Sequence, residues 1–116
     1  RHNVAPHGQQ PAPRAPLASH HGVQRRDLEL NVPGYDPEQD PTILLDRGEH
    51  AFITGEQASA RAAAKKATGT PYAGDYGAKR AAAIEQMRRA GVPEPKIAEW
   101  VLEHDAYMFG LDQPTR

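Results

Sequence analysis

The chain has 116 residues, of which 14 are basic and 15 acidic, and its net charge is -1. It contains no cysteine, which excludes a disulfide scaffold, a zinc ribbon and a thiol nucleophile. No apolar run approaches the roughly 18 residues that a membrane span needs. Ala accounts for 19 residues, whereas Leu, Ile, Val and Phe together account for 18, so we expect a thin core that a bound metal or partner would supplement.

The first segment is rich in proline. Residues 1–18 contain four prolines and little apolar content, which predicts a stiff, extended linker. The predicted folded domain therefore covers residues 19–116. His2 and His7 lie in the linker and are expected to be solvated.

A short strand is predicted in the middle of the acidic first half. Residues 42–45 form an apolar, partly β-branched run between Pro41 and Asp46. We expect its partner strand within residues 20–30, where Val23 and two leucines are the apolar anchors.

Three helical regions follow the predicted strand. Asp46 and Glu49 have the spacing of a capping box, which predicts a helix directly after Asp46. The alanine-rich residues 56–67 favour a helix with a second start signal. Another helix is predicted over residues 76–90, ended by a left-handed cap at Gly91.

The last helix has the clearest pattern. Ile97, Val101, His104 and Met108 are spaced i, i+4, i+7 and i+11, which places them on one continuous stripe. Such a stripe predicts a core-forming helix. We therefore expect His104 to be a hydrogen-bonded core histidine and assign no chemistry to it.

Three other histidines are candidates for chemistry. His20 and His21 are adjacent at the predicted first strand, and His50 lies just inside a predicted helix. Adjacent strand residues point to opposite faces, so one imidazole could bind a cation while its neighbour acts as a general base. A second ligand could come from a helix packed on the hairpin, as His50 would. Coincidental surface histidines are the alternative interpretation.

The charge is distributed unevenly along the chain. Residues 19–56 carry three basic and eight acidic side chains, whereas residues 57–90 carry seven basic and two acidic ones. A basic middle third can hold a polyanion, with Arg61, Lys65 and Lys66 as candidate phosphate contacts. A solvated helix face is the alternative.

Four segments, in this order along the chain, together carry a resemblance to a known family. They are Ser19-His20-His21-Gly22-Val23-Gln24, Asn31-Val32-Pro33-Gly34-Tyr35, Asp40-Pro41-Thr42-Ile43-Leu44 and Glu49-His50. They resemble nuclease toxin domains of the HNH superfamily with a GHH-type signature, which occur at the C-termini of bacterial polymorphic toxins and type VI secretion effectors. The resemblance implies an α+β fold, a small ββα-metal hairpin–helix core with additional C-terminal helices.

The resemblance also implies roles for the histidines. His20 and His50 would bind one divalent metal ion, with Mg²⁺ ranked first and Zn²⁺, Mn²⁺ or Ni²⁺ as further candidates. His21 would be the general base that activates water.

The sequence departs from the GHH pattern at three places. Ser19 stands where that signature has Gly, and Thr54, a poor ligand, stands where colicin DNases have a further helix ligand. The middle Asn of the signature is replaced around Asp40. Asn31 and Asp40 are therefore candidate orienting or ligating residues.

The implied activity is that of a metal-dependent endonuclease toxin that cleaves DNA in competing bacteria. Its implied partners are DNA, a cognate immunity protein, and a parent effector or secretion apparatus reached through the N-terminal linker. The producer would secrete it by contact-dependent delivery, and it would act in the target-cell cytoplasm without inserting into the membrane. A ribonuclease on the same scaffold and a non-enzymatic effector adaptor are the alternatives.

Overall fold

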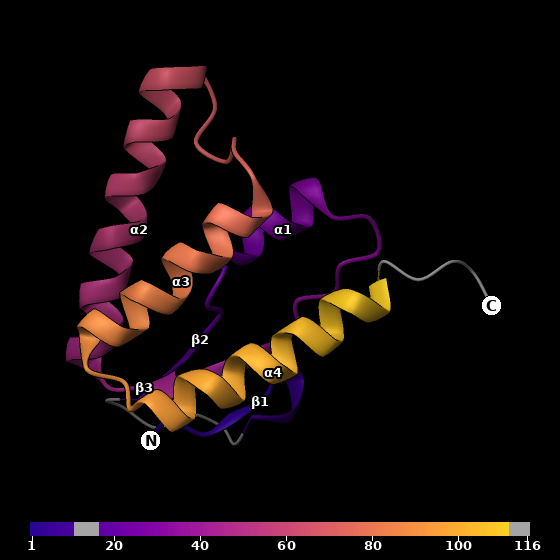
Figure 1. Cartoon of the computed structure of the whole chain (residues 1–116), viewed down its shortest axis with the longest axis vertical. Helices are drawn as coiled ribbons and strands as arrows, with labels where there is room; N and C mark the ends of the chain where they lie inside the picture. The colour runs from indigo at the N-terminus through magenta and orange to yellow at the C-terminus, as the bar shows by residue number, and fades with distance from the viewer. Residues whose placement is uncertain (11–16, 112–116) are drawn as a thin grey trace.

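A computed structural model of the chain describes residues 1–10 and 17–111. In this part of the chain, three short strands form one antiparallel sheet in the order β1-β3-β2 (Figure 1). The elements in chain order are β1 (Val4–Pro6), the 3-10 turn η1 (His7–Gln9), β2 (Ala18–His20), α1 (Arg25–Asn31), β3 (Pro41–Leu45), α2 (Arg47–Thr68), α3 (Tyr76–Ala90) and α4 (Glu94–Leu111). The predicted α+β class is confirmed, and β2, β3 and α2 supply the strand–strand–helix order.

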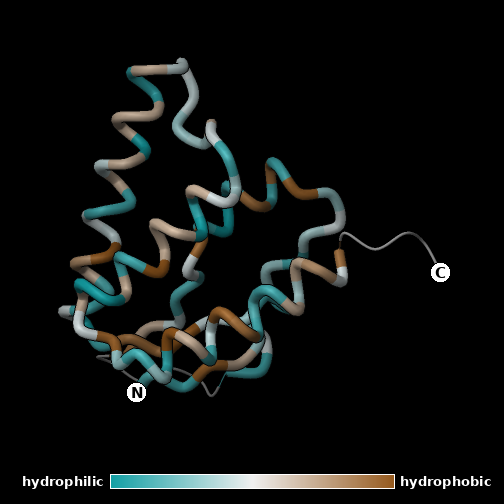
Figure 2. The backbone as a smooth tube through the Cα atoms, in the orientation of Figure 1, coloured by the Kyte–Doolittle hydropathy of each residue, from teal (hydrophilic) through white to brown (hydrophobic). Residues whose placement is uncertain are grey.

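The helices cover the sheet from one side. In Figure 1, α4 crosses β3 and β1, and α3 lies between α4 and α2. Figure 2 shows hydrophobic stretches where the start of α2 and the helix α4 meet the sheet, and further ones on α3 and α1. The core there contains ten buried apolar residues, with Ile43, Leu45, Ile53, Met87 and Trp100 fully enclosed. Among the described residues, no helix has both the length and the apolarity to cross a membrane.

The N-terminal segment is part of the sheet. Val4 pairs with Ile43 and Pro6 with Pro41 in antiparallel register, and the main-chain bond from Leu44 N to Asn3 O extends this pairing. The prediction of an unfolded linker is wrong for these residues, because an extended chain can serve as an edge strand, where proline is tolerated. Residues 11–16 of the predicted linker lie outside the described residues.

The partner of β3 lies earlier than predicted. β2 places Ser19 opposite Leu44 and His20 opposite Ile43, whereas most of residues 20–30 form a turn and α1. The prediction of a strand within residues 20–30 is wrong, because residues 25–31 form the short helix α1, which buries Leu28. An ion pair between Asp27 of α1 and Lys79 of α3, 2.8 Å long, fixes that helix.

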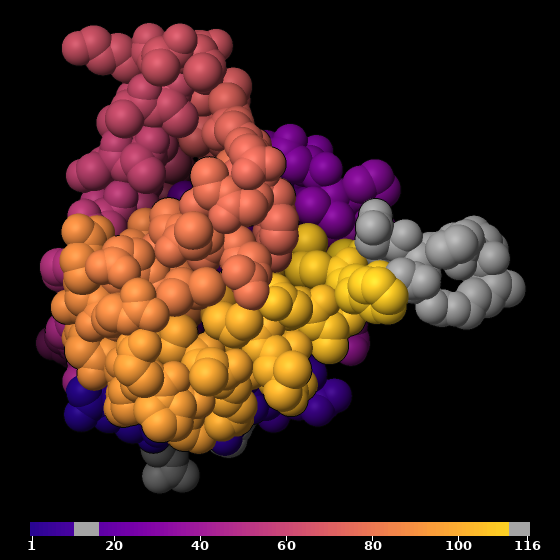
Figure 3. Space-filling view, in the orientation of Figure 1, coloured from indigo at the N-terminus to yellow at the C-terminus, as the bar shows by residue number. Residues whose placement is uncertain are grey.

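The capping box predicted at the start of α2 is confirmed. The Asp46 side chain accepts from Glu49 N, and the Glu49 side chain accepts from Asp46 N. The two predicted helical regions form one helix of 22 residues that ends at Gly69, where φ is 86°. In Figure 3, the far end of α2 projects beyond the body of the molecule.

The two C-terminal helices match their predictions closely. α3 begins after the Asp75 cap and ends at Gly91, where φ is 95°. On α4, Ile97 and His104 of the predicted stripe are buried, and Trp100 is fully enclosed as well. The indole N–H of Trp100 donates to Pro41 O at 3.2 Å, which ties α4 to the beginning of β3.

Gly22→Ala is expected to destabilise the fold. A Cβ at Gly22 would lie 2.7 and 2.8 Å from Cε2 and Cη2 of the enclosed Trp100 ring, so the ring or the main chain must move. Overpacking of this kind costs about 1–3 kcal/mol. Chemical denaturation measures the loss, with Gly55→Ala as the control. Gly55 lies inside α2 with open space around its Cα, so that change should stabilise the helix by up to about 1 kcal/mol. Equal stability of the two variants would contradict the packing argument.

Candidate functional site

Two of the predicted histidines meet between the sheet and α2. His20 is the last residue of β2 and is buried, whereas His50 lies half-buried in the first turn of α2. Their ring centroids are 5.7 Å apart in an edge-on arrangement. The structure therefore brings together the strand histidine and the helix histidine that the sequence analysis selected.

His20 carries a buried nitrogen with no partner. Among the buried side-chain polar atoms of the described residues, His20 Nε2 is the one without a hydrogen bond. Burial, followed by the nearby His50 and His21 charges, lowers the pKa of His20 to about 3, so the imidazole is neutral. A buried unpaired nitrogen is costly, and a neutral imidazole nitrogen is the form that binds a metal. His20 Nε2 therefore has the properties of a metal ligand, and the His50 ring nearby could supply a second one.

The first turn of α2 is held firmly around His50. Glu49, buried beside it, accepts hydrogen bonds from the Arg1 guanidinium at 3.0 Å and contacts His2 Nε2 at 2.8 Å. Burial raises the pKa of Glu49, but the hydrogen bonds from Arg1, Asp46 N and His2 outweigh it and lower that pKa. The expectation that His2 is solvated is therefore wrong, because its ring joins this cluster.

The protein donors for a cation are few. In residues 1–10 and 17–111, no group of three or more His, Asp or Glu side chains is arranged to hold a metal ion. His20 and His50 form a two-histidine set, and Thr54, one turn after His50, is exposed. An ion on two imidazoles keeps coordination positions for water and substrate oxygens, as catalytic metal sites do.

His21 lies against the loop before β3. Its Nε2 is 3.0 Å from Pro37 O, and since a carbonyl can only accept, Nε2 carries the proton. The Nδ1 atom of the neutral ring therefore has the free lone pair. Burial lowers the pKa of His21, opposed by the Pro37 hydrogen bond and the charge of Asp40. The ring is thus set up as a neutral base with Nδ1 as its accepting atom.

His7, which has no motif of its own in the sequence, also lies at this site. The His7 ring lies 5.0 Å from the His21 ring, and His7 Nδ1 is 2.8 Å from Ser19 Oγ. The expectation that His7 is a solvated linker residue is wrong, because β1 brings its ring against His21. Its position depends on a strand pairing over a long separation, for which a three-residue strand gives no sequence pattern.

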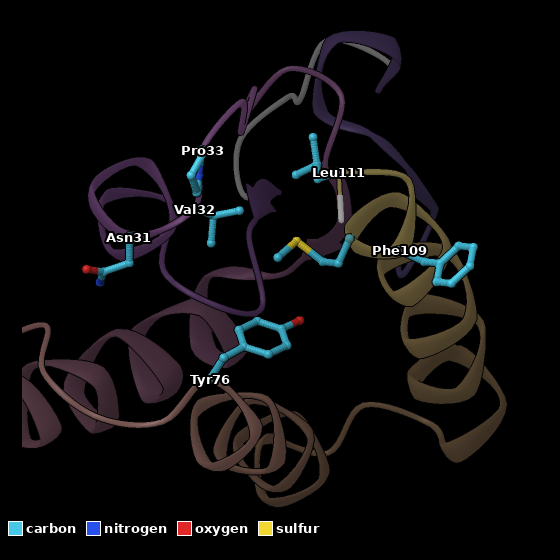
Figure 4. A pocket seen from close by; sticks show the side chains of 7 residues that line it. Asn31, Val32, Pro33, Tyr76, Phe109 and Leu111 are labelled. Carbon is cyan, nitrogen blue, oxygen red and sulfur yellow. The ribbon is translucent and has the colours of Figure 1, made fainter. Parts of the chain in front are cut away.

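Asp40 and Asn31 are engaged elsewhere. Asp40 is buried and accepts from Tyr35 OH at 2.5 Å and from His104 Nδ1 at 2.6 Å. Asn31 ends α1, where its amide donates to Asp27 Oδ1 at 2.8 Å. It also lines a pocket of about 550 Å³ at the C-terminal end of α4 (Figure 4). The contacts of both residues therefore favour structural roles over the predicted orienting or ligating ones.

The predicted phosphate contacts lie on the second half of α2. Lys65 and Lys66 are exposed near its projecting end. Arg61 is half-buried, and its guanidinium donates to Gln24 Oε1 in the segment between the histidine pair and α1. The three side chains thus lie along α2 between its contact with Gln24, three residues after His21, and its projecting end.

His104 has the core role that its spacing predicted. Its ring stacks on Trp100 with centroids 4.7 Å apart, and Tyr76 OH lies 2.7 Å from its Nε2. With Nδ1 bonded to Asp40, both ring nitrogens have partners. This network joins α3, α4 and the loop before β3.

A family of HNH/Endo VII superfamily toxins with a SHH signature matches residues 14–109. Ser19-His20-His21 is where these three letters occur in the matched region, so Ser19 agrees with the signature of this family and departs only from the GHH pattern. No curated protein and no solved structure matches the chain. The match spans most of the chain and contains all three candidate histidines, and the chain belongs to this SHH-signature family of nuclease toxins.

Proposed function

We propose that this domain is a metal-dependent endonuclease toxin that cleaves DNA, with His21 as general base and His20 and His50 as metal ligands. One observation carries the proposal: the adjacent histidines have different surroundings. His20 has a buried Nε2 without a hydrogen-bond partner and its ring lies 5.7 Å from the His50 ring, whereas His21 has its Nε2 proton on a main-chain carbonyl. This difference matches a division between a ligand and a base.

The protein's own part in the reaction is proton transfer and positioning. His21 Nδ1 would take a proton from the water that attacks phosphorus, while the Pro37 carbonyl keeps the ring oriented. A bound divalent ion supplies neutralisation of charge on the phosphate and on the departing 3′ oxygen. His20 and His50 would hold it through neutral nitrogens.

The donor set bears on which ion is bound. Imidazole nitrogens suit Zn²⁺ and Ni²⁺, whereas Mg²⁺ prefers oxygen ligands and retains several waters. On donor chemistry, two histidines favour Zn²⁺ or Ni²⁺ over Mg²⁺, the ion ranked first from the family resemblance. Activity assays should therefore include all four ions.

The test of the function uses the full chain with plasmid DNA and with total RNA, with a chelator or with each ion. We expect DNA cleavage that needs the ion and is lost in His21→Ala. Cleavage of RNA alone would assign a ribonuclease to the same scaffold. A His21→Ala variant that remains fully toxic in a recipient cell would favour the non-enzymatic adaptor.

A triple change of Arg61, Lys65 and Lys66 to Gln is expected to weaken DNA binding and reduce its salt dependence. Each phosphate contact contributes about 0.9 to the slope of log K against log salt on duplex DNA. The control changes Arg88, Arg89 and Lys96 to Gln, since each of these three side chains already forms an ion pair with a carboxylate. Affinity titrations over a range of salt measure both slopes. If the triple variant and its control have equal slopes, Arg61, Lys65 and Lys66 do not contact phosphates and form a solvated helix face.

The family membership suggests how the domain is used. A toxin that cleaves nucleic acid endangers its producer, so we infer a cognate immunity protein with an acidic surface against the basic half of α2. We further propose delivery by a parent effector in a contact-dependent manner, with action in the cytoplasm of the target cell. Co-expression with a candidate immunity protein, followed by rescue of growth, tests the immunity partner.

A further inference from the structure

We propose that His7 is a positioning residue for His21, supplied by a segment that precedes the matched family region. The inference rests on the proposed role of His21 as the base. His7 begins η1, directly after β1, and lies before residue 14, where the family match starts. The nuclease site would thus extend beyond the signature that defines the family.

The main chain of His7 is fixed to the loop that orients His21. His7 N donates to Asp40 O at 3.1 Å, and Gly8 N donates to Glu38 O at 2.8 Å. Pro37, whose carbonyl accepts from His21 Nε2, lies in the same loop. The start of η1 therefore holds this loop by two hydrogen bonds next to the residue that sets the His21 orientation.

The two rings are also in contact. Their centroids are 5.0 Å apart and their planes are inclined by 45°. His21 is thus held by the Pro37 carbonyl at Nε2 and by the His7 ring beside it. Removing the His7 ring would leave space into which His21 could rotate, and this rotation would move Nδ1 from its position.

A chain of hydroxyl groups fixes the His7 ring. Thr42 Oγ1 donates its one hydrogen to Ala5 O at 3.3 Å, and Ser19 Oγ donates its one hydrogen to Thr42 Oγ1 at 2.8 Å. Since both hydroxyl hydrogens are used, His7 Nδ1 must be the donor in its 2.8 Å contact with Ser19 Oγ. Ser19, the first residue of the signature, therefore orients the His7 ring.

The experiment compares His7→Ala, His7→Phe and Gln9→Ala in the full chain. Gln9 lies exposed in the same turn and serves as the matched control. For His7→Ala we expect kcat to fall by about 10- to 100-fold, the loss typical of a displaced catalytic group, with KM and metal affinity unchanged. His7→Phe keeps a ring against His21 and should retain more of kcat, and Gln9→Ala should match the wild type.

A second measurement does not depend on activity. Side-chain nitrogen chemical shifts at about pH 8, above the ordinary histidine pKa, report which ring nitrogen of His21 carries the proton. We expect one tautomer, protonated at Nε2, in the wild type and in Gln9→Ala, and a mixture in His7→Ala. Unchanged shifts and unchanged kcat in a folded His7→Ala variant would overturn the proposal. So would a lower kcat that follows loss of metal. If the wild type cleaves no nucleic acid, the proposed function fails, and the shifts alone still decide whether His7 positions His21.

Discussion

His21→Ala is expected to lower kcat by about 10²–10⁴-fold, the range typical of a lost general base. Metal affinity and thermal stability should stay close to those of the wild type, because the substitution removes one ring and one hydrogen bond to Pro37 O. Calorimetric titration with a divalent ion and a thermal melt measure these two properties, and a cleavage assay on plasmid DNA measures kcat.

The ligand variants provide the contrast. His20→Ala and His50→Ala should lower metal affinity and turnover together, because each removes one of the two proposed ligands, whose rings lie 5.7 Å apart. His20→Ala also removes the unpaired Nε2 from the interior, so the stability that it loses without metal should be smaller than for a hydrogen-bonded histidine. Loss of metal binding in His21→Ala would instead make His21 a ligand.

The largest effect on stability is expected at Asp40. Asp40→Ala should lower the free energy of unfolding by about 3–5 kcal/mol, the range for removing one partner of a buried pair. The change leaves Tyr35 OH and His104 Nδ1 in the interior without their acceptor. Burial, and then the charge of Asp40, raises the pKa of Tyr35, which keeps that hydroxyl protonated as a donor.

Two further variants calibrate the loss in urea denaturation. Asp40→Asn keeps one acceptor oxygen for two donors and should fall between Asp40→Ala and the wild type. Asp36→Ala, in the same loop, removes an exposed carboxylate that accepts from Glu38 N at 3.0 Å, and should cost no more than about 1 kcal/mol. An Asp40→Ala variant as stable as Asp36→Ala would show that the network contributes little.

Local sequence signals predicted the elements whose ends have chemical markers. The capping box at Asp46 and the left-handed Gly91 define the start of α2 and the end of α3. The apolar spacing on α4 likewise identified His104 as a core residue. In each case the signal lies within a few residues of the feature that it predicts.

The remaining features depend on contacts between distant parts of the chain. β1 and β2 have three residues each, too few for an alternating pattern to be recognised. α1 has no side-chain cap at Gln24. The missed neighbour of the site, His7, reaches His21 only because β1 pairs with β3. The sequence therefore selected His20, His21 and His50, but it contained no indication of the groups that hold His21 in place.

The strand order has a consequence for when the site can form. β3 is the central strand, and its partners β1 and β2 both precede it along the chain. During synthesis from the N-terminus, neither pairing can close until β3 has emerged, and both closures join residues distant in sequence, which slows folding. His20 and His21 are therefore made well before β3 and α2 can enclose them. We expect the nascent chain to gain the proposed cation site and the proposed base together, as a late event in folding.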